Sequence, residues 1–122
     1  MTNQQICDLR ITEIYHFGIN KLQQLYYFKE AEAIWQFLNK YPFILPILLT
    51  APDKIHQYFP GDRLGLKVHL DPGATEHDEE LFIIIFTKIE CNEAVEKLWK
   101  LDEYWSLHIC REAQHKLEIH LG

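Results

Sequence analysis

Hydrophobic residues in the first half of the chain recur at helical spacing. Between residues 28 and 41 they fall three or four positions apart, which is typical of one buried face of an amphipathic helix. Pro42 should end this helix, because the residue before a proline is pushed out of the helical region. Residues 1–25 show a weaker pattern that Gly18 interrupts, and we assign this segment to a helix as well.

Two further short helices are expected before the middle of the chain. The apolar run at 43–50 contains Pro46, which a helix tolerates near its start, where the missing N–H has no bond to lose. Thr50 and Pro52 then show the pattern of a helix cap followed by an early proline. We therefore expect one helix at 43–50 and a separate one at 51–59.

Residues in the second half alternate between apolar and polar, as they do in strands. Residues 63–70 follow this alternation, whereas 81–87 are apolar on both faces, which is expected for a central strand covered from both sides. The intervening segment, 71–80, is too short for a helical crossover, so the two strands should form an antiparallel hairpin. The covered face of the first strand would carry Leu64, Leu66, Val68 and Leu70.

One more helix and one more strand complete the pattern. Residues 92–105 carry an apolar stripe at helical spacing, with Asn92 as the expected N-cap. Residues 116–121 alternate again and form a third strand parallel to the second, lying beside either the second or the first. The order of elements predicts an α+β fold, with a helical N-terminal half followed by a small β-hairpin-α-β sheet packed against helices.

Length and composition favour a single domain over residues 1–122. The chain is 48% hydrophobic and 13% aromatic, which is enough for one core. Its net charge of −6 argues against a nucleic-acid partner, because broad positive surfaces supply most non-specific affinity for DNA and RNA. The sequence shows neither a signal peptide nor an apolar run of membrane-spanning length, and its three separated cysteines suit free thiols. We expect a cytoplasmic protein with no membrane partner.

The acidic segment at 71–80 is the most distinctive polar feature. It contains five carboxylates and one histidine but no Lys or Arg. Hard cations such as calcium favour clustered oxygen ligands, yet the spacing lacks the alternating acids of an EF-hand loop. We favour a solvated turn whose charges keep a hydrophobic sheet edge soluble. The candidate ion or partner contacts are Asp71, Glu76, His77, Asp78, Glu79 and Glu80.

Known catalytic and cofactor-binding patterns are not evident. The glycines form no phosphate-binding loop, and the chain has no G-x-S-x-G turn. His108 and Cys110, with His115 and His120, suggest a zinc or copper site, but His115 and His120 match only half of the usual zinc-site spacing. Cys91, just before a predicted helix, has no identified histidine partner. We expect no catalytic residue, no bound metal and no cofactor.

Aromatic residues near the end of the 92–105 helix are candidates for contact with a partner. Trp99 and Tyr104 belong to residue types that are enriched where proteins bind one another most tightly. The alternative is that Trp105 packs in the core while the other two partly cover the sheet.

Residues 34–121 contain a helical section, a hairpin with an acid-rich turn, and a helix rich in Trp and Asp near its end. The segments concerned are FLNKYPFILPILLTAPDKIHQYFP, LGLKVHLDP, EELFIIIFT and EAVEKLWKLDEYW. In this layout the chain resembles a group of short uncharacterised bacterial proteins. The resemblance implies no activity, cofactor or catalytic residue.

These patterns favour a non-enzymatic protein-interaction module over an enzyme. Strand 81–87 is apolar on both faces whereas strand 63–70 has one polar face, so the face they share must be covered by residues 1–25 or by a second copy of the chain. We expect a homodimer, or a subunit that binds another cytoplasmic protein. The alternative is a small metal-dependent enzyme or ligand-binding protein that uses the acidic 71–80 segment and nearby histidines.

Overall fold

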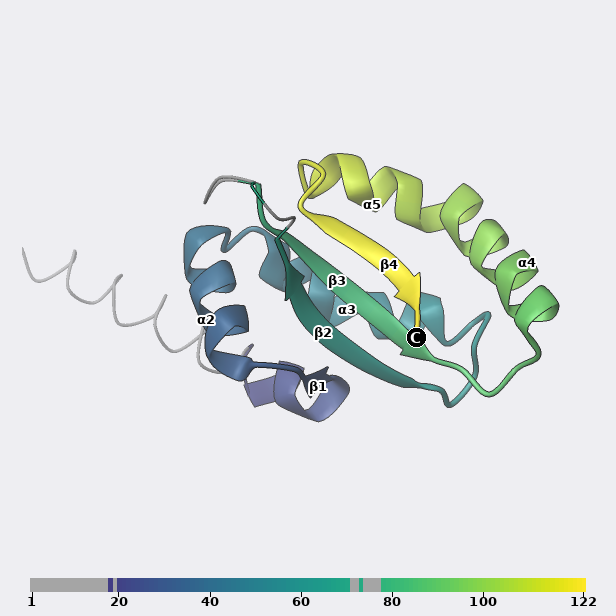
Figure 1. Ribbon diagram of the computed structural model, residues 1–122. Coiled ribbons are helices and arrows are strands. Elements are labelled where there is room, and N and C mark those ends of the chain that lie inside the picture. Colours follow the sequence, from purple (N-terminus) through teal and green to yellow (C-terminus); the bar gives the residue numbers. More distant parts are fainter. Residues whose placement is uncertain (1–17, 19, 71–72, 74–77) are drawn as a thin grey trace, which may run out of the picture.

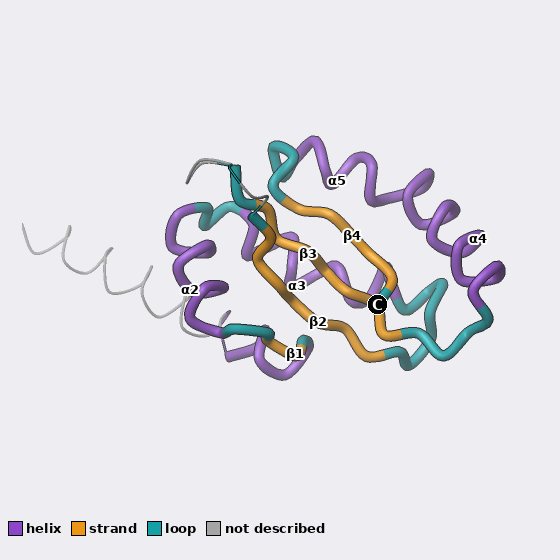
Figure 2. Tube along the Cα trace, viewed as in Figure 1, coloured by secondary structure: helices purple, strands orange, loops and turns teal. Residues whose placement is uncertain are grey.

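The computed structural model describes residues 18, 20–70, 73 and 78–122. A mixed sheet with the strand order β1-β2-β3-β4 packs against helices, which confirms the α+β class (Figure 1). In chain order the elements are β1 (Tyr27–Phe28), α2 (Ala31–Lys40), α3 (Ile44–Ile55), β2 (Arg63–His69), β3 (Glu80–Phe86), α4 (Cys91–Leu101), a π-helical segment η1 (Asp102–Ser106), α5 (Leu107–Glu112) and β4 (Leu117–Leu121). Figure 2 shows the same trace coloured by element type.

The predicted hairpin and the parallel third strand are both present. β2 and β3 pair antiparallel with Leu66 opposite Ile83, and β4 lies parallel beside β3 with Ile119 opposite Ile83. The sequence left open whether the third strand lies beside the second strand or the first. It lies beside the second, β3, and β4 therefore forms one edge of the sheet. The other edge is β1, a strand of two residues that the sequence pattern did not predict and that pairs parallel with β2.

One face of the sheet carries the core. Side chains alternate along a strand, so residues opposite one another in register share a face. On this face the fully or almost fully buried side chains are Leu64, Leu66, Leu81, Ile83, Ile85 and Leu117. Leu70 was expected in this set, but it lies beyond the end of β2 and is 49% exposed.

Residues 44–55 form one continuous helix, α3, instead of the two short helices that were predicted. Pro52 lies inside this helix, and a proline there leaves the carbonyl four residues earlier, that of Leu48, without its N–H donor. The buried hydroxyl of Tyr26 donates a hydrogen bond of 2.7 Å to this same carbonyl oxygen. The missing helix bond is thus replaced from outside the helix, which explains why Pro52 does not end α3.

The Tyr26 hydroxyl is also shielded from water. Burial raises the pKa of Tyr26 well above its ordinary value, because the phenolate would lose its hydration. In the unfolded chain the phenol ionises at about pH 10. The neutral phenol therefore contributes stability below that pH, and this contribution is lost as the pH rises above it.

The helical segment after β3 begins and ends at other residues than predicted. Its N-cap is Glu90, not Asn92, because the Glu90 carboxylate accepts hydrogen bonds from the backbone N–H groups of Asn92 at 3.2 Å and Glu93 at 3.3 Å. Past residue 105 the chain continues helically to Glu112. Figure 1 shows this long segment running alongside β4, while α3 crosses behind the sheet.

Candidate functional site

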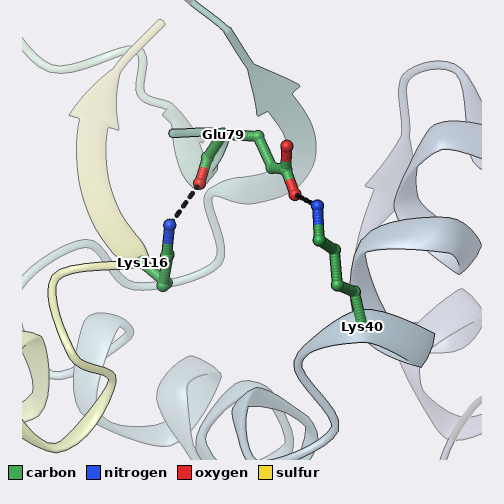
Figure 3. Close-up of polar contacts among 3 residues, drawn as sticks. All are labelled: Lys40, Glu79 and Lys116. Atoms are coloured by element: carbon green, nitrogen blue, oxygen red, sulfur yellow. Dashed lines mark hydrogen bonds and ion pairs between the residues drawn. The ribbon is translucent and has the colours of Figure 1, made fainter. Parts of the chain in front are cut away.

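The acidic candidates do not form one described site. Asp71, Glu76 and His77 lie outside the described residues, whereas Asp78, Glu79 and Glu80 lead into β3. The Glu79 carboxylate lies 2.8 Å from Nζ of Lys40 on α2, and Nζ of Lys116 donates to the Glu79 backbone carbonyl at 3.5 Å (Figure 3). Glu79 therefore connects α2, the hairpin and the start of β4. Sequence reasoning missed this structural role, because Lys40 and Lys116 are remote in the chain.

The histidines that suggested a metal site lie on separate elements. His108 is on α5, His115 is in the turn before β4, and His120 is on β4, where its ring lies 3.0 Å from the Glu118 carboxylate. In the part of the chain that the structure describes, no three His, Cys, Asp or Glu side chains are grouped to hold a metal ion. The metal-dependent or ligand-binding alternative remains a prediction that depends on residues 71–80.

The aromatic candidates are on the surface. Trp99 on α4 is 67% exposed and Tyr104 on η1 is 69% exposed, whereas Trp105 is half-buried and packs against the core. Their exposure leaves Trp99 and Tyr104 as candidate partner contacts. Cys91, a free cysteine, is the exposed first residue of α4.

The face of the sheet opposite the core is only partly covered by the described residues. We call it the open face, and its side chains are half-buried or exposed except at Gly65. Most of one expected cover for this face, residues 1–17 and 19 of the segment assigned to a helix at 1–25, lies outside the described residues, so the expectation that β3 is covered from both sides stays a prediction. The open face comprises Tyr27 of β1, Arg63, Gly65, Lys67 and His69 of β2, Glu80, Phe82, Ile84 and Phe86 of β3, and Glu118 and His120 of β4.

Aromatic side chains make contact across the open face. The ring of Phe82 lies between two imidazoles, with centroid distances of 4.7 Å to His69 and 4.1 Å to His120. The ring of Phe86 lies over Gly65, where an added Cβ would approach the ring to 2.8 Å. The open face is therefore an apolar stripe on β3 flanked by polar and charged residues.

A groove of about 210 Å³ follows the free edge of β4. Its walls are Asp102, Leu107 and Ile109 on the helical side and residues 117–120 on the strand side. Leu107 is 61% exposed, although it is a large apolar residue. This groove is the feature that sequence reasoning missed, because the alternation of 116–121 predicts a strand but does not say that the strand lies at an edge.

The backbone of β4 presents alternating residues to this groove. Leu81 N–H donates to the carbonyl of Lys116 at 2.8 Å, and Gly122 N–H donates to the carbonyl of Ile85 at 2.9 Å. In a parallel ladder alternate residues of a strand bond to the same neighbour, so these two bonds determine which residues of β4 face β3. The even-numbered residues of β4 direct their N–H and C=O groups toward β3. The odd-numbered residues Leu117, Ile119 and Leu121 direct theirs outward. Within the described part of the chain, no other element makes a backbone hydrogen bond to these outward groups.

Comparisons with protein-family models, curated proteins and solved structures find no match to this chain. The resemblance to short bacterial proteins therefore remains a prediction from the sequence. Among the described helices, none has the length and apolar character needed to cross a membrane.

Proposed function

We propose that the protein is a protein-interaction module that works as a homodimer, and that the copies meet at the β4 groove. The observation that carries this proposal is an edge strand with an apolar wall beside it, whose outward backbone groups have no backbone partner among the described residues. An exposed edge of this kind is a template for another strand, because each N–H and C=O gains a partner when a strand is added.

The groove supplies both requirements of strand addition. The outward groups of Leu117, Ile119 and Leu121 offer main-chain hydrogen bonds, which give affinity, and the side chains beside them give specificity. Leu107 and Ile109 form the apolar part of the helical wall. An added strand would cover Leu107, and its large exposure in the single chain is thereby accounted for.

The open face offers a second surface for a partner-binding role. Among the described residues, this face of a single chain presents a short apolar stripe with Phe82, Ile84 and Phe86 in its centre. A dimer joined at the β4 edge would leave this face accessible and place two such stripes on one assembly. We propose that another protein binds there, in keeping with a subunit that acts by binding rather than by catalysis.

We place this function in the bacterial cytoplasm. Support comes from the exposed free thiol of Cys91, which a reducing compartment would keep from forming disulfides. The location and the bacterial source are parts of the proposal.

Sedimentation equilibrium over about 1–200 μM protein tests the dimer, because a dimer with a Kd of about 1 μM or weaker, about −8 kcal/mol, changes its population across this range. We expect a mass approaching twice the chain mass of 14.6 kDa at the upper concentrations. Leu107→Glu should shift the equilibrium toward the monomer, since it places a charge in the apolar wall. Leu70→Glu is the matched control, because it makes the same substitution at another exposed leucine, which lies beyond the end of β2 and does not line the groove. A constant mass of one chain at all concentrations would overturn the proposal.

A further inference from the structure

We infer that the strand received by the β4 groove is β4 of a second copy, paired antiparallel about a two-fold axis that passes midway between the two Ile119 residues. This inference rests on the proposed homodimer and specifies its geometry. A two-fold axis requires the contact to be self-complementary: where one residue faces a second residue of the other copy, the second also faces the first. Each such pair must therefore be chemically compatible. The sequence of β4 and the phase of its backbone bonds are sufficient to examine that requirement.

The backbone limits the possible registers. Only odd-numbered residues of β4 direct their N–H and C=O groups outward, and antiparallel strands bond through residues whose groups point toward each other. Symmetric pairings that preserve most of the overlap are therefore centred on Glu118, on Ile119 or on His120. In each of them odd residues face odd residues and exchange both of their hydrogen bonds.

The side chains distinguish these registers. Centring on Glu118 places two carboxylates face to face, and centring on His120 places two imidazoles face to face. Centring on Ile119 places each Glu118 opposite His120 of the second copy, at the non-hydrogen-bonded positions where paired side chains lie closest. In the single chain the same two groups already attract each other, with His120 Nε2 3.0 Å from Glu118 Oε2. In the Ile119 register, therefore, the Glu118 carboxylate of each copy can pair with the His120 imidazole of the other copy.

The other side of the sheet favours the same register. There it places Leu117 opposite Leu121 of the second copy, and Ile119 opposite its own symmetry mate. These residues share a face with the buried Ile83 and Ile85 of β3, so the two cores would continue across the axis. Leu107 and Ile109 line the groove on this helical side and would cover the incoming apolar side chains. The Ile119 register also pairs Leu117–Leu121 over its full length, whereas the alternatives shorten the overlap.

Residue-resolved amide hydrogen exchange by NMR tests the backbone part of the inference. In the wild type at dimer-forming concentration, the amides of Leu117, Ile119 and Leu121 should exchange slowly, because they bond to the second copy. In a Leu107→Glu variant that sediments as a monomer they should exchange at least tenfold faster. The amides of Glu118 and His120 point to β3 and should remain slow in both proteins.

The exchange pattern separates failure of this inference from failure of the proposed function. A dimer in which the odd-numbered β4 amides exchange as fast as in the monomer would overturn edge pairing and leave the homodimer standing. A chain that is monomeric throughout would overturn both.

A mixing experiment tests the register. Glu118→Lys should raise the homodimer Kd about tenfold by opposing lysine to His120, and His120→Glu should do so by opposing two glutamates; a tenfold change is 1.4 kcal/mol. Mixed together, the two variants should form a heterodimer with a Kd within about threefold of the wild type, because the new lysine faces the new glutamate and the native pair is retained. Both positions are about half exposed, so we expect both variants to fold, and circular dichroism checks this.

The mixing result isolates the contact between copies. Each variant alters its own Glu118–His120 contact equally in homodimer and heterodimer, so that effect cancels from the comparison. Glu96→Lys, on the exposed side of α4, is the charge-matched control and should leave the Kd unchanged within about twofold. A mixture that dimerises no more tightly than either variant alone would overturn the Ile119 register.

Discussion

Truncation of two neighbouring isoleucines on β3 should have very different effects on stability. Ile83 is 0% exposed and lies between Leu66 of β2 and Ile119 of β4 on the core face, whereas Ile84 is half-buried on the open face. Replacing either with alanine removes the same three carbon atoms from the same strand. The two variants therefore differ mainly in which face of the sheet loses them.

The loss at Ile83 can be estimated from two contributions. Transfer of three buried carbons is worth about 2.4 kcal/mol at about 0.8 kcal/mol for each. The cavity left in a close-packed site adds about 1–2 kcal/mol, since neighbours on three sides relax only partly. We therefore expect Ile83→Ala to lower the free energy of unfolding by about 4 kcal/mol. At Ile84 solvent can fill the space, so the expected loss is about 1 kcal/mol.

Urea unfolding followed by circular dichroism, with all proteins at one concentration, measures both losses. Similar slopes of free energy against urea for the wild type and both variants would show that the comparison is valid. A loss at Ile84 as large as the loss at Ile83 would refute the reasoning, because it would mean that both faces of β3 are enclosed in solution.

Three further predictions concern polar groups. Tyr26→Phe should lower the free energy of unfolding by about 1–2 kcal/mol at neutral pH, because it removes a buried hydrogen bond. It should also weaken the decline in stability above about pH 10, because it removes the phenol that ionises on unfolding. Urea melts at several pH values measure both effects. Glu90→Ala should cost about 1 kcal/mol by removing the cap of α4, whereas Asn92→Ala, a control at the predicted cap, should cost less than about 0.5 kcal/mol; equal losses would contradict the cap assignment. A double-mutant cycle of Lys40→Met and Glu79→Gln should give a coupling free energy of about 0.5–1 kcal/mol. Salt at about 1 M should lower this coupling free energy by screening the charges. A coupling of zero would show that this ion pair does not hold α2 to the hairpin.

The sequence was sufficient where local periodicity and short connections decide the outcome. The alternation at 63–70, the apolar run at 81–87 and the short link between them predicted the antiparallel pairing of β2 with β3. The alternation at 116–121 predicted β4, and the intervening helix predicted that it runs parallel to β3. In these cases the chain segment itself contains the determining information, because alternation and connection length do not depend on remote residues.

Contacts between remote residues decided the features that the sequence left open or predicted wrongly. Two helices were predicted where α3 is one, because the Leu48 carbonyl freed by Pro52 is satisfied by Tyr26. Tyr26 precedes Leu48 by 22 residues, so it gives no local signal. The β1 strand escaped prediction because two residues cannot show a period. The partner of Glu79 lies on α2, and no pattern in the acidic segment points to Lys40.

The candidate interaction surface depends on both kinds of information. The sequence by itself determined that β4 alternates and that Glu118 and His120 share a face, because the period of a strand is two. Only the tertiary structure decided that β4 lies at the edge, that Leu117, Ile119 and Leu121 point their backbone groups outward, and that Leu107 forms a wall beside them. Strand order and hydrogen-bond phase arise from the packing of the whole sheet against its helices, and a strand at an edge and a strand in the centre can have the same alternating pattern.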